Sequence, residues 1–113
     1  MDLKLDKFAH FWEDVKVNRR TYPVHIMVNG HKIKTVVIDP HYEIKHSATV
    51  TDELILQLVA QLDGGDFSPE SVVKNFEYHM TDNLVVGGKK YRLVWLIEKE
   101  QLFVGVINAY RRK

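Results

Sequence analysis

The short stretch from Pro40 to His46 gathers the side chains best suited to acid–base chemistry: His41, Glu43, Lys45 and His46. Histidine is the natural general acid or base near neutral pH. A lysine ammonium is a compact charge that can stabilise the oxyanion formed when a phosphate is attacked. This combination predicts phosphoryl-transfer chemistry, with His41 as the base, or Glu43 or His46 in its place. The competing interpretation is structural: one histidine helps to cap a helix and the other packs at its end.

The spacing of these residues fits a short helix better than a metal site. His41 and Lys45 are four residues apart and would share one helical face, with Glu43 and His46 around its side. His41 and His46 are five residues apart, and the chain has no HExxH motif and no cysteine, so a zinc site is a poor fit. The glycine pairs at 64–65 and 87–88 lack the P-loop pattern, and no GxSxG motif marks a nucleophilic serine. We therefore expect neither a metal nor a cofactor.

Basic and aromatic side chains collect near the end of the chain. Arg92 together with Arg111 or Arg112 would stand at the ends of otherwise apolar strands, where arginine can bind a phosphate through two hydrogen bonds. Tyr110 offers a ring on which a base can stack. A solvated basic chain end is the competing interpretation. The candidate RNA-binding residues are Lys89, Lys90, Tyr110, Arg111 and Arg112.

Charge is segregated along the chain, although the net charge is only +1. Residues 51–70 hold five acidic residues and no lysine or arginine, whereas residues 87–113 hold seven basic residues and two acidic ones. A polyanion such as RNA would be attracted to the second stretch and repelled by the first. Two solvated faces of opposite sign are an equally good interpretation.

Several elements must hold these residues in place. Apolar residues at helical spacing predict a helix over residues 3–17. Alternating apolar residues predict a hairpin over 22–38 that turns at Asn29 and Gly30, because both tolerate positive φ. Asp39 and Pro40 mark the start of a short helix over 40–46. Thr51 caps a longer helix over 52–62, which the glycines at 64–65 stop before a loop over 66–74.

Strand-like patterns fill the rest of the chain, over 76–80, 84–86, 90–98 and 102–111. The predicted fold is α+β: helices packed on an antiparallel sheet, with an N-terminal helix and hairpin, two central helices and C-terminal antiparallel strands. The length fits a single domain over residues 1–113. There is no secretory signal, no apolar stretch long enough to span a membrane and no cysteine, so we expect a soluble cytoplasmic protein.

The same central segment resembles a known family. The pattern His41-x3-Lys45-x4-Val50-Thr51, followed by an acidic helix start, is similar to H-x3-R-x4-I-S in BrnT-like and related toxin domains of the barnase–EndoU–colicin–RelE ribonuclease class. Lysine stands at position 45 where the family usually has arginine. The segments 89–95 and 102–112 resemble the late strands of RelE-like toxins, so the resemblance covers about residues 40–112.

This resemblance implies a cytoplasmic toxin that cleaves RNA without a metal and is neutralised by a protein antitoxin. The reaction would be attack of a ribose 2′-OH on the adjacent phosphate. A non-catalytic protein-interaction domain, of the immunity or adaptor type, is the alternative, with residues 51–70 as its acidic binding face. A ribonuclease fold that only binds nucleic acid is a third possibility. The RNA target and the oligomeric state do not follow from the sequence.

Overall fold

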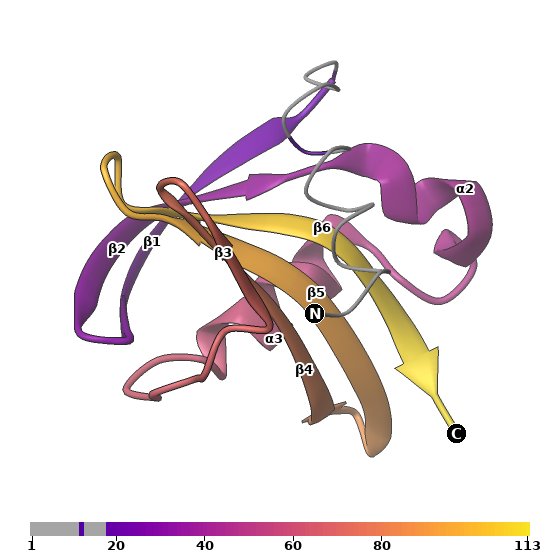
Figure 1. Cartoon of the computed structure of the whole chain (residues 1–113). Helices are drawn as coiled ribbons and strands as arrows, with labels where there is room; N and C mark the ends of the chain where they lie inside the picture. The colour runs from indigo at the N-terminus through magenta and orange to yellow at the C-terminus, as the bar shows by residue number, and fades with distance from the viewer. Residues whose placement is uncertain (1–11, 13–17) are drawn as a thin grey trace.

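One six-stranded sheet forms the centre of the molecule in the computed structural model, which describes Trp12 and residues 18–113 (Figure 1). The strands lie in the order β1-β2-β6-β5-β4-β3. β2 runs parallel to β6, and every other neighbouring pair is antiparallel. Their bounds are β1 Arg20–Val28, β2 His31–Ile38, β3 Ser71–Val73, β4 Phe76–Val86, β5 Lys89–Glu98 and β6 Phe103–Arg112.

The first two strands form the predicted hairpin. β1 and β2 pair antiparallel and turn at Asn29 and Gly30, whose φ angles are 53° and 77°. Such positive φ values are what a two-residue type I′ turn requires, and glycine and asparagine adopt them at low cost. The predicted turn is therefore confirmed.

Three short helical segments connect β2 to the later strands. η1 (Pro40–Tyr42) begins after Asp39, whose side chain accepts a hydrogen bond from the backbone N–H of His41 at 2.8 Å. α2 (Glu43–His46) adds a single α-helical turn. α3 (Asp52–Ala60) begins after Thr51, whose hydroxyl accepts a hydrogen bond from the Leu54 N–H at 3.2 Å. Both predicted helix caps are confirmed, because a side-chain oxygen satisfies an otherwise unpaired first-turn amide.

The predicted fold class, α+β with helices packed on an antiparallel sheet, is wrong. Strand residues make up 53% and helical residues 18% of the described structure, and the sheet is mixed because β2 is parallel to β6. The two predicted central helices do not form a layer: residues 40–46 make one 3-10 turn and one α turn, and α3 ends at Ala60. The predicted N-terminal helix over 3–17 falls, apart from Trp12, outside the described residues.

The reason lies in what an apolar pattern can specify. Alternation indicates which side of a strand is buried, but it does not name the neighbouring strand, and β2 pairs with a strand far away in the sequence. The predicted loop over 66–74 contains β3, which is too short to give a pattern. The stretches 76–80 and 84–86 form one strand, β4, because an irregularity between Thr81 and Leu84 interrupts the alternation without ending the strand.

Both faces of the sheet bury apolar side chains. On one face, Ile55, Leu58 and Val59 of α3 join a core that includes Trp95 of β5. On the other face, Trp12 packs in a smaller cluster with Tyr78, Val94, Leu96 and Ile107. At Gly105, an added Cβ would lie 2.6 Å from the Trp12 ring, so this close approach requires glycine.

The C-terminal half of β6 extends beyond β2. The paired register of the two strands ends at Ile38 and Val106, whereas β6 continues to Arg112. The chain leaves β2 through Asp39, whose N–H donates to the Val106 carbonyl at 3.0 Å, and enters η1 and α2 beside β6 (Figure 1). This arrangement places the segment 40–46 next to the last residues of the sheet. Among the described residues, no helix has both the length and the apolar character needed to cross a membrane.

Candidate functional site

A cavity of about 380 Å³ lies between α2 and the C-terminal half of β6. Four of the predicted site residues contribute to it, three from the segment 40–46 and one from β6. The cavity therefore brings together histidine and lysine side chains of η1 and α2 with a tyrosine of β6, which is far away in the sequence. Its lining residues are His41, Ile44, Lys45, His46, Asn108 and Tyr110.

His46 stacks on Tyr110 inside this cavity, with the ring centroids 5.2 Å apart and the planes inclined by 25°. Burial lowers the pKa of His46 below its ordinary value of 6.5, and the nearby positive charges of Lys45 and His41 lower it further. At neutral pH the ring is therefore mainly neutral and able to accept a proton. These are the properties of a general base.

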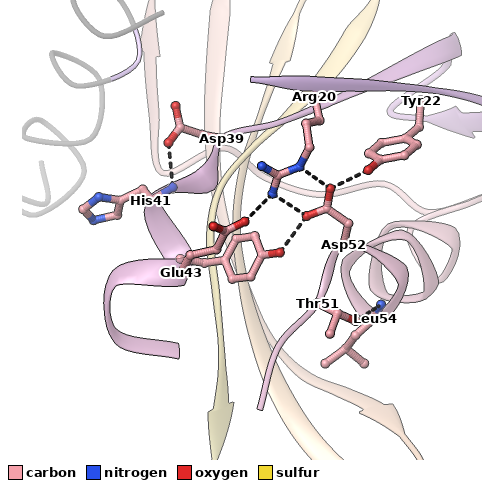
Figure 2. Close-up of polar contacts among 9 residues, drawn as sticks. Arg20, Tyr22, Asp39, His41, Glu43, Thr51, Asp52 and Leu54 are labelled. Atoms are coloured by element: carbon pink, nitrogen blue, oxygen red, sulfur yellow. Dashed lines mark hydrogen bonds and ion pairs between the residues drawn. The ribbon is translucent and has the colours of Figure 1, made fainter. Parts of the chain in front are cut away.

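His41 is held at the start of η1 by its backbone. Its N–H donates to Asp39, a carboxylate that is only 2% exposed and that also accepts a hydrogen bond from Arg19 at 2.8 Å. Figure 2 shows the His41 ring pointing away from the group of residues around Arg20. The buried Asp39 thus anchors the backbone at His41, whose imidazole ring points away from Arg20 and contributes to the cavity lining.

Glu43 is not part of this cavity lining. Its carboxylate accepts a hydrogen bond from Arg20 Nη2 at 2.6 Å and lies on the opposite side of the segment from His41 (Figure 2). Of the three side chains that the sequence allowed as the base, Glu43 is therefore the one that the structure separates from the other two.

Asp52 is the centre of a polar cluster that also contains Arg20, Tyr22, Tyr42 and Glu43, here called the Asp52 cluster (Figure 2). Arg20 binds the two Asp52 oxygens at 2.6 and 2.8 Å, and both tyrosine hydroxyls donate to the same carboxylate. The Arg20 hydrogen bonds, helped by the two hydroxyls and opposed by burial, lower the pKa of Asp52 to about 2. The cluster joins β1 to the start of α3, and its carboxylates are paired with Arg20, as is typical of a structural element.

Arg92 approaches the cavity from β5, through Tyr110. Its guanidinium binds the two oxygens of Asp82 at 2.7 Å each, and its Nη1 atom donates to the Tyr110 hydroxyl at 3.1 Å. The hydrogen bonds that Arg92 donates to Asp82 lower the pKa of this carboxylate. Arg112 Nε lies 3.8 Å from the same carboxylate. Arg92 therefore contacts a residue of the cavity wall, but its own charge is paired with Asp82.

The remaining basic candidates divide between the two faces of the sheet. Alternate residues of a strand share a face, so Lys90 lies on the face of Arg92, whereas Lys89 lies on the face of buried Tyr91. In the paired register, Arg111 is opposite Tyr91 and Arg112 is opposite Lys90. Lys90 and Arg112 therefore belong to the side of the candidate site, and Lys89 and Arg111 do not.

The sequence interpretation missed three residues at or near this site. Asn108 lines the cavity, and its only signal in the sequence was a polar side chain in an apolar strand. Ile44 also lines the cavity although it is 74% exposed. Asp82, the partner of Arg92, lies ten positions earlier in the chain and gave no signal.

Within the described part of the chain, no group of three or more histidine, cysteine, aspartate or glutamate side chains is arranged to hold a metal ion. Comparisons with protein-family models, with curated proteins and with solved structures found no match.

Proposed function

We propose that this protein is a metal-independent endoribonuclease of the toxin type, similar to BrnT-like and RelE-like domains, with its active site in the cavity between α2 and β6. The observation that carries the proposal is the meeting of His41, Lys45 and His46 around one cavity whose wall is Tyr110. Two imidazoles, one cation and one aromatic ring are the groups needed to move protons, stabilise an attacked phosphate and hold a base.

The proposed reaction begins with attack of a ribose 2′ oxygen on the adjacent phosphorus. His46, which is mainly neutral at pH 7, accepts the 2′-OH proton. Lys45 stabilises the phosphorane oxyanion, and His41, as the general acid, gives a proton to the departing 5′ oxygen as the P–O5′ bond breaks. The products are a 2′,3′-cyclic phosphate and a 5′-OH end. DNA lacks the nucleophile and remains uncut.

The charges around the cavity support an anionic substrate. Lys45 lines the cavity, and Lys90 and Arg112 are exposed on the same side of the sheet. Binding of RNA to such a surface releases counterions, so the affinity should fall steeply as salt increases. A flat salt response would contradict this part of the proposal.

The proposed setting is the cytoplasm, where RNA is available and where a protein antitoxin would neutralise the enzyme. The alternative, an immunity or adaptor domain that uses an acidic face over 51–70, has less support. Asp52 accepts hydrogen bonds from Arg20, and Asp63 accepts a hydrogen bond from the Met27 N–H at 2.8 Å. Two of the acidic side chains of that stretch therefore already accept hydrogen bonds from other parts of the same chain.

The decisive test uses purified protein with RNA in the presence of EDTA. We expect cleavage that leaves 2′,3′-cyclic phosphate ends, and a loss of rate of about a hundred- to ten-thousand-fold in His46→Ala and in His41→Ala. His25→Ala is the matched control, because His25 is exposed on β1, away from the cavity. The wild-type rate should also fall as the pH drops below the His46 pKa, since a protonated ring is no longer a base.

Three outcomes would overturn the proposal. Variants that cut RNA at the wild-type rate would remove His41 and His46 from the reaction. Loss of cleavage in EDTA would keep an enzyme but replace the mechanism. An absence of RNA cleavage by purified protein, by protein on translating ribosomes and in induced cells would discard the ribonuclease and favour the interaction domain.

A further inference from the structure

We infer that Asp82 is a positioning residue of the proposed ribonuclease site: it fixes Arg92 and, through Arg92, the Tyr110 ring that walls the cavity. The inference rests on the proposed function. A continuous set of hydrogen bonds carries it, from Asp82 on β4 through the Arg92 guanidinium on β5 to the Tyr110 hydroxyl on β6. Arg92 thereby connects three neighbouring strands at one level of the sheet.

The backbone of β4 is shaped to bring Asp82 to Arg92. The pairing of β4 with β5 shifts register between Thr81 and Leu84, and Asn83, inside this irregularity, has a φ of 62°. An irregularity of this kind changes the direction in which side chains leave a strand. Asp82 lies within it and binds Arg92 with both carboxylate oxygens at 2.7 Å.

Tyr110 is only partly buried against the apolar cluster that contains Trp12, so contacts of its ring and hydroxyl also help to fix its orientation. Its ring stacks on His46, and its hydroxyl accepts the Arg92 Nη1 hydrogen bond at 3.1 Å. Arg92 is also directly opposite Tyr110 in the β5–β6 register. An arginine without a fixed partner samples many rotamers, so the two-point Asp82 contact is what keeps the donor at the hydroxyl.

This role differs from that of a phosphate ligand in a way that can be measured. If Arg92 bound the substrate phosphate, Asp82 would compete with the substrate, and removal of Asp82 would improve binding and leave turnover intact. If Asp82 positions Tyr110 through Arg92, its removal should lower kcat. RNA binding should then stay the same or become tighter, because Arg92 and Arg112 both lose a nearby negative charge.

The experiment compares Asp82→Asn with Glu100→Gln in the full chain, measuring kcat and KM for RNA cleavage. Glu100 is an exposed acid in the turn after β5, so Glu100→Gln changes the net charge equally without touching the cavity. We expect kcat to fall on the order of ten- to a hundredfold in Asp82→Asn with KM unchanged or lower, and no change in Glu100→Gln. Asp82→Glu, which retains a carboxylate, should recover part of the loss. An unchanged kcat in Asp82→Asn would overturn the inference.

A second measurement, the NMR titration of the His46 ring in protein without RNA, separates this inference from the proposed function. In Asp82→Asn a displaced Tyr110 should expose His46, so its pKa should rise toward 6.5, while Lys45 and His41 still face it. Glu100→Gln should leave the titration unchanged. If wild-type protein never cuts RNA, the proposed function fails, but a shift of the His46 titration in Asp82→Asn still supports the positioning role. An unchanged titration would overturn it, even if turnover fell.

Discussion

Two polar regions flank the segment from Asp39 to His46: one pairs opposite charges, and the other gathers basic side chains without a carboxylate. In the Asp52 cluster one carboxylate receives an arginine and two tyrosine hydroxyls, so opposite charges and donors meet. In the cavity beside β6, the lining contains two histidines and a lysine and no carboxylate. The pKa values follow the same division, because Asp52 is stabilised in its charged form and His46 in its neutral form.

This difference separates a region that pairs its charges from a region whose basic side chains fit the proposed anionic substrate. A folded chain lowers its free energy by pairing charges, as the Asp52 cluster does when it connects β1 with α3. Like charges gathered around a cavity repel one another, so Lys45 and His41 add to the effect of burial in lowering the pKa of His46. An anionic substrate would remove this repulsion. Mutations in the two regions should therefore separate stability from activity.

Asp52→Asn should give the largest loss of stability. The substitution removes the charge that pairs with Arg20, and an asparagine can accept hydrogen bonds with only one oxygen. We expect a decrease of about 2 to 3 kcal/mol in the free energy of unfolding, measured by urea denaturation. RNA cleavage per folded molecule should not change. A large loss of cleavage with normal stability would contradict the division between the two regions.

The same variant should change how stability depends on pH. The pKa of Asp52 falls from an ordinary value of 3.8 to about 2 in the folded protein, so its contribution is complete above pH 4 and is lost as the pH falls toward 2. That contribution is on the order of 2 kcal/mol. The difference in unfolding free energy between wild type and Asp52→Asn should therefore shrink over this window. A difference that stays constant with pH would show that the loss of stability in Asp52→Asn does not come from the ion pair.

Local signals in the sequence predicted local structure well. The turn at Asn29 and Gly30 and the caps at Asp39 and Thr51 follow from backbone geometry that few residues can satisfy. The sheet order could not be predicted in this way, because parallel pairing of β2 with β6 depends on contacts between distant segments. Short elements such as β3 also contain too few residues to show a period.

In the candidate site too, features set by local sequence could be predicted, whereas features set by contacts between distant segments could not. Spacing within one segment placed His41, Lys45 and His46 together, and all three line the cavity. Glu43 was included by the same spacing, but Arg20, from a distant strand, draws it to the other side. The Arg92 partner could not be predicted, since an irregularity in β4 decides where Asp82 points.

Thr51→Ala tests the edge of the Asp52 cluster with a smaller effect. The Thr51 hydroxyl accepts a hydrogen bond from the Leu54 N–H in the first turn of α3, beside Asp52 (Figure 2). Its loss should lower the free energy of unfolding by about 1 kcal/mol. Thr51→Ser, which retains the hydroxyl, should be close to wild type in the same denaturation experiment. Equal midpoints for Thr51→Ala and wild type would mean that the cap contributes nothing.

Glu43→Gln gives the smallest expected effect and the sharpest comparison of the two regions, because Glu43 lies between two cavity residues in sequence but belongs to the Asp52 cluster in space. Its contact with Arg20 is largely exposed, so its loss should cost about 0.5 kcal/mol or less. Cleavage should remain at the wild-type rate, whereas a catalytic base would lose about a hundred- to ten-thousand-fold. Measurements of the cleavage rate of Glu43→Gln and His46→Ala, made side by side, decide whether Glu43 takes part in the reaction. A strong loss of cleavage in Glu43→Gln would return Glu43 to the active site and show that the segment turns when RNA binds.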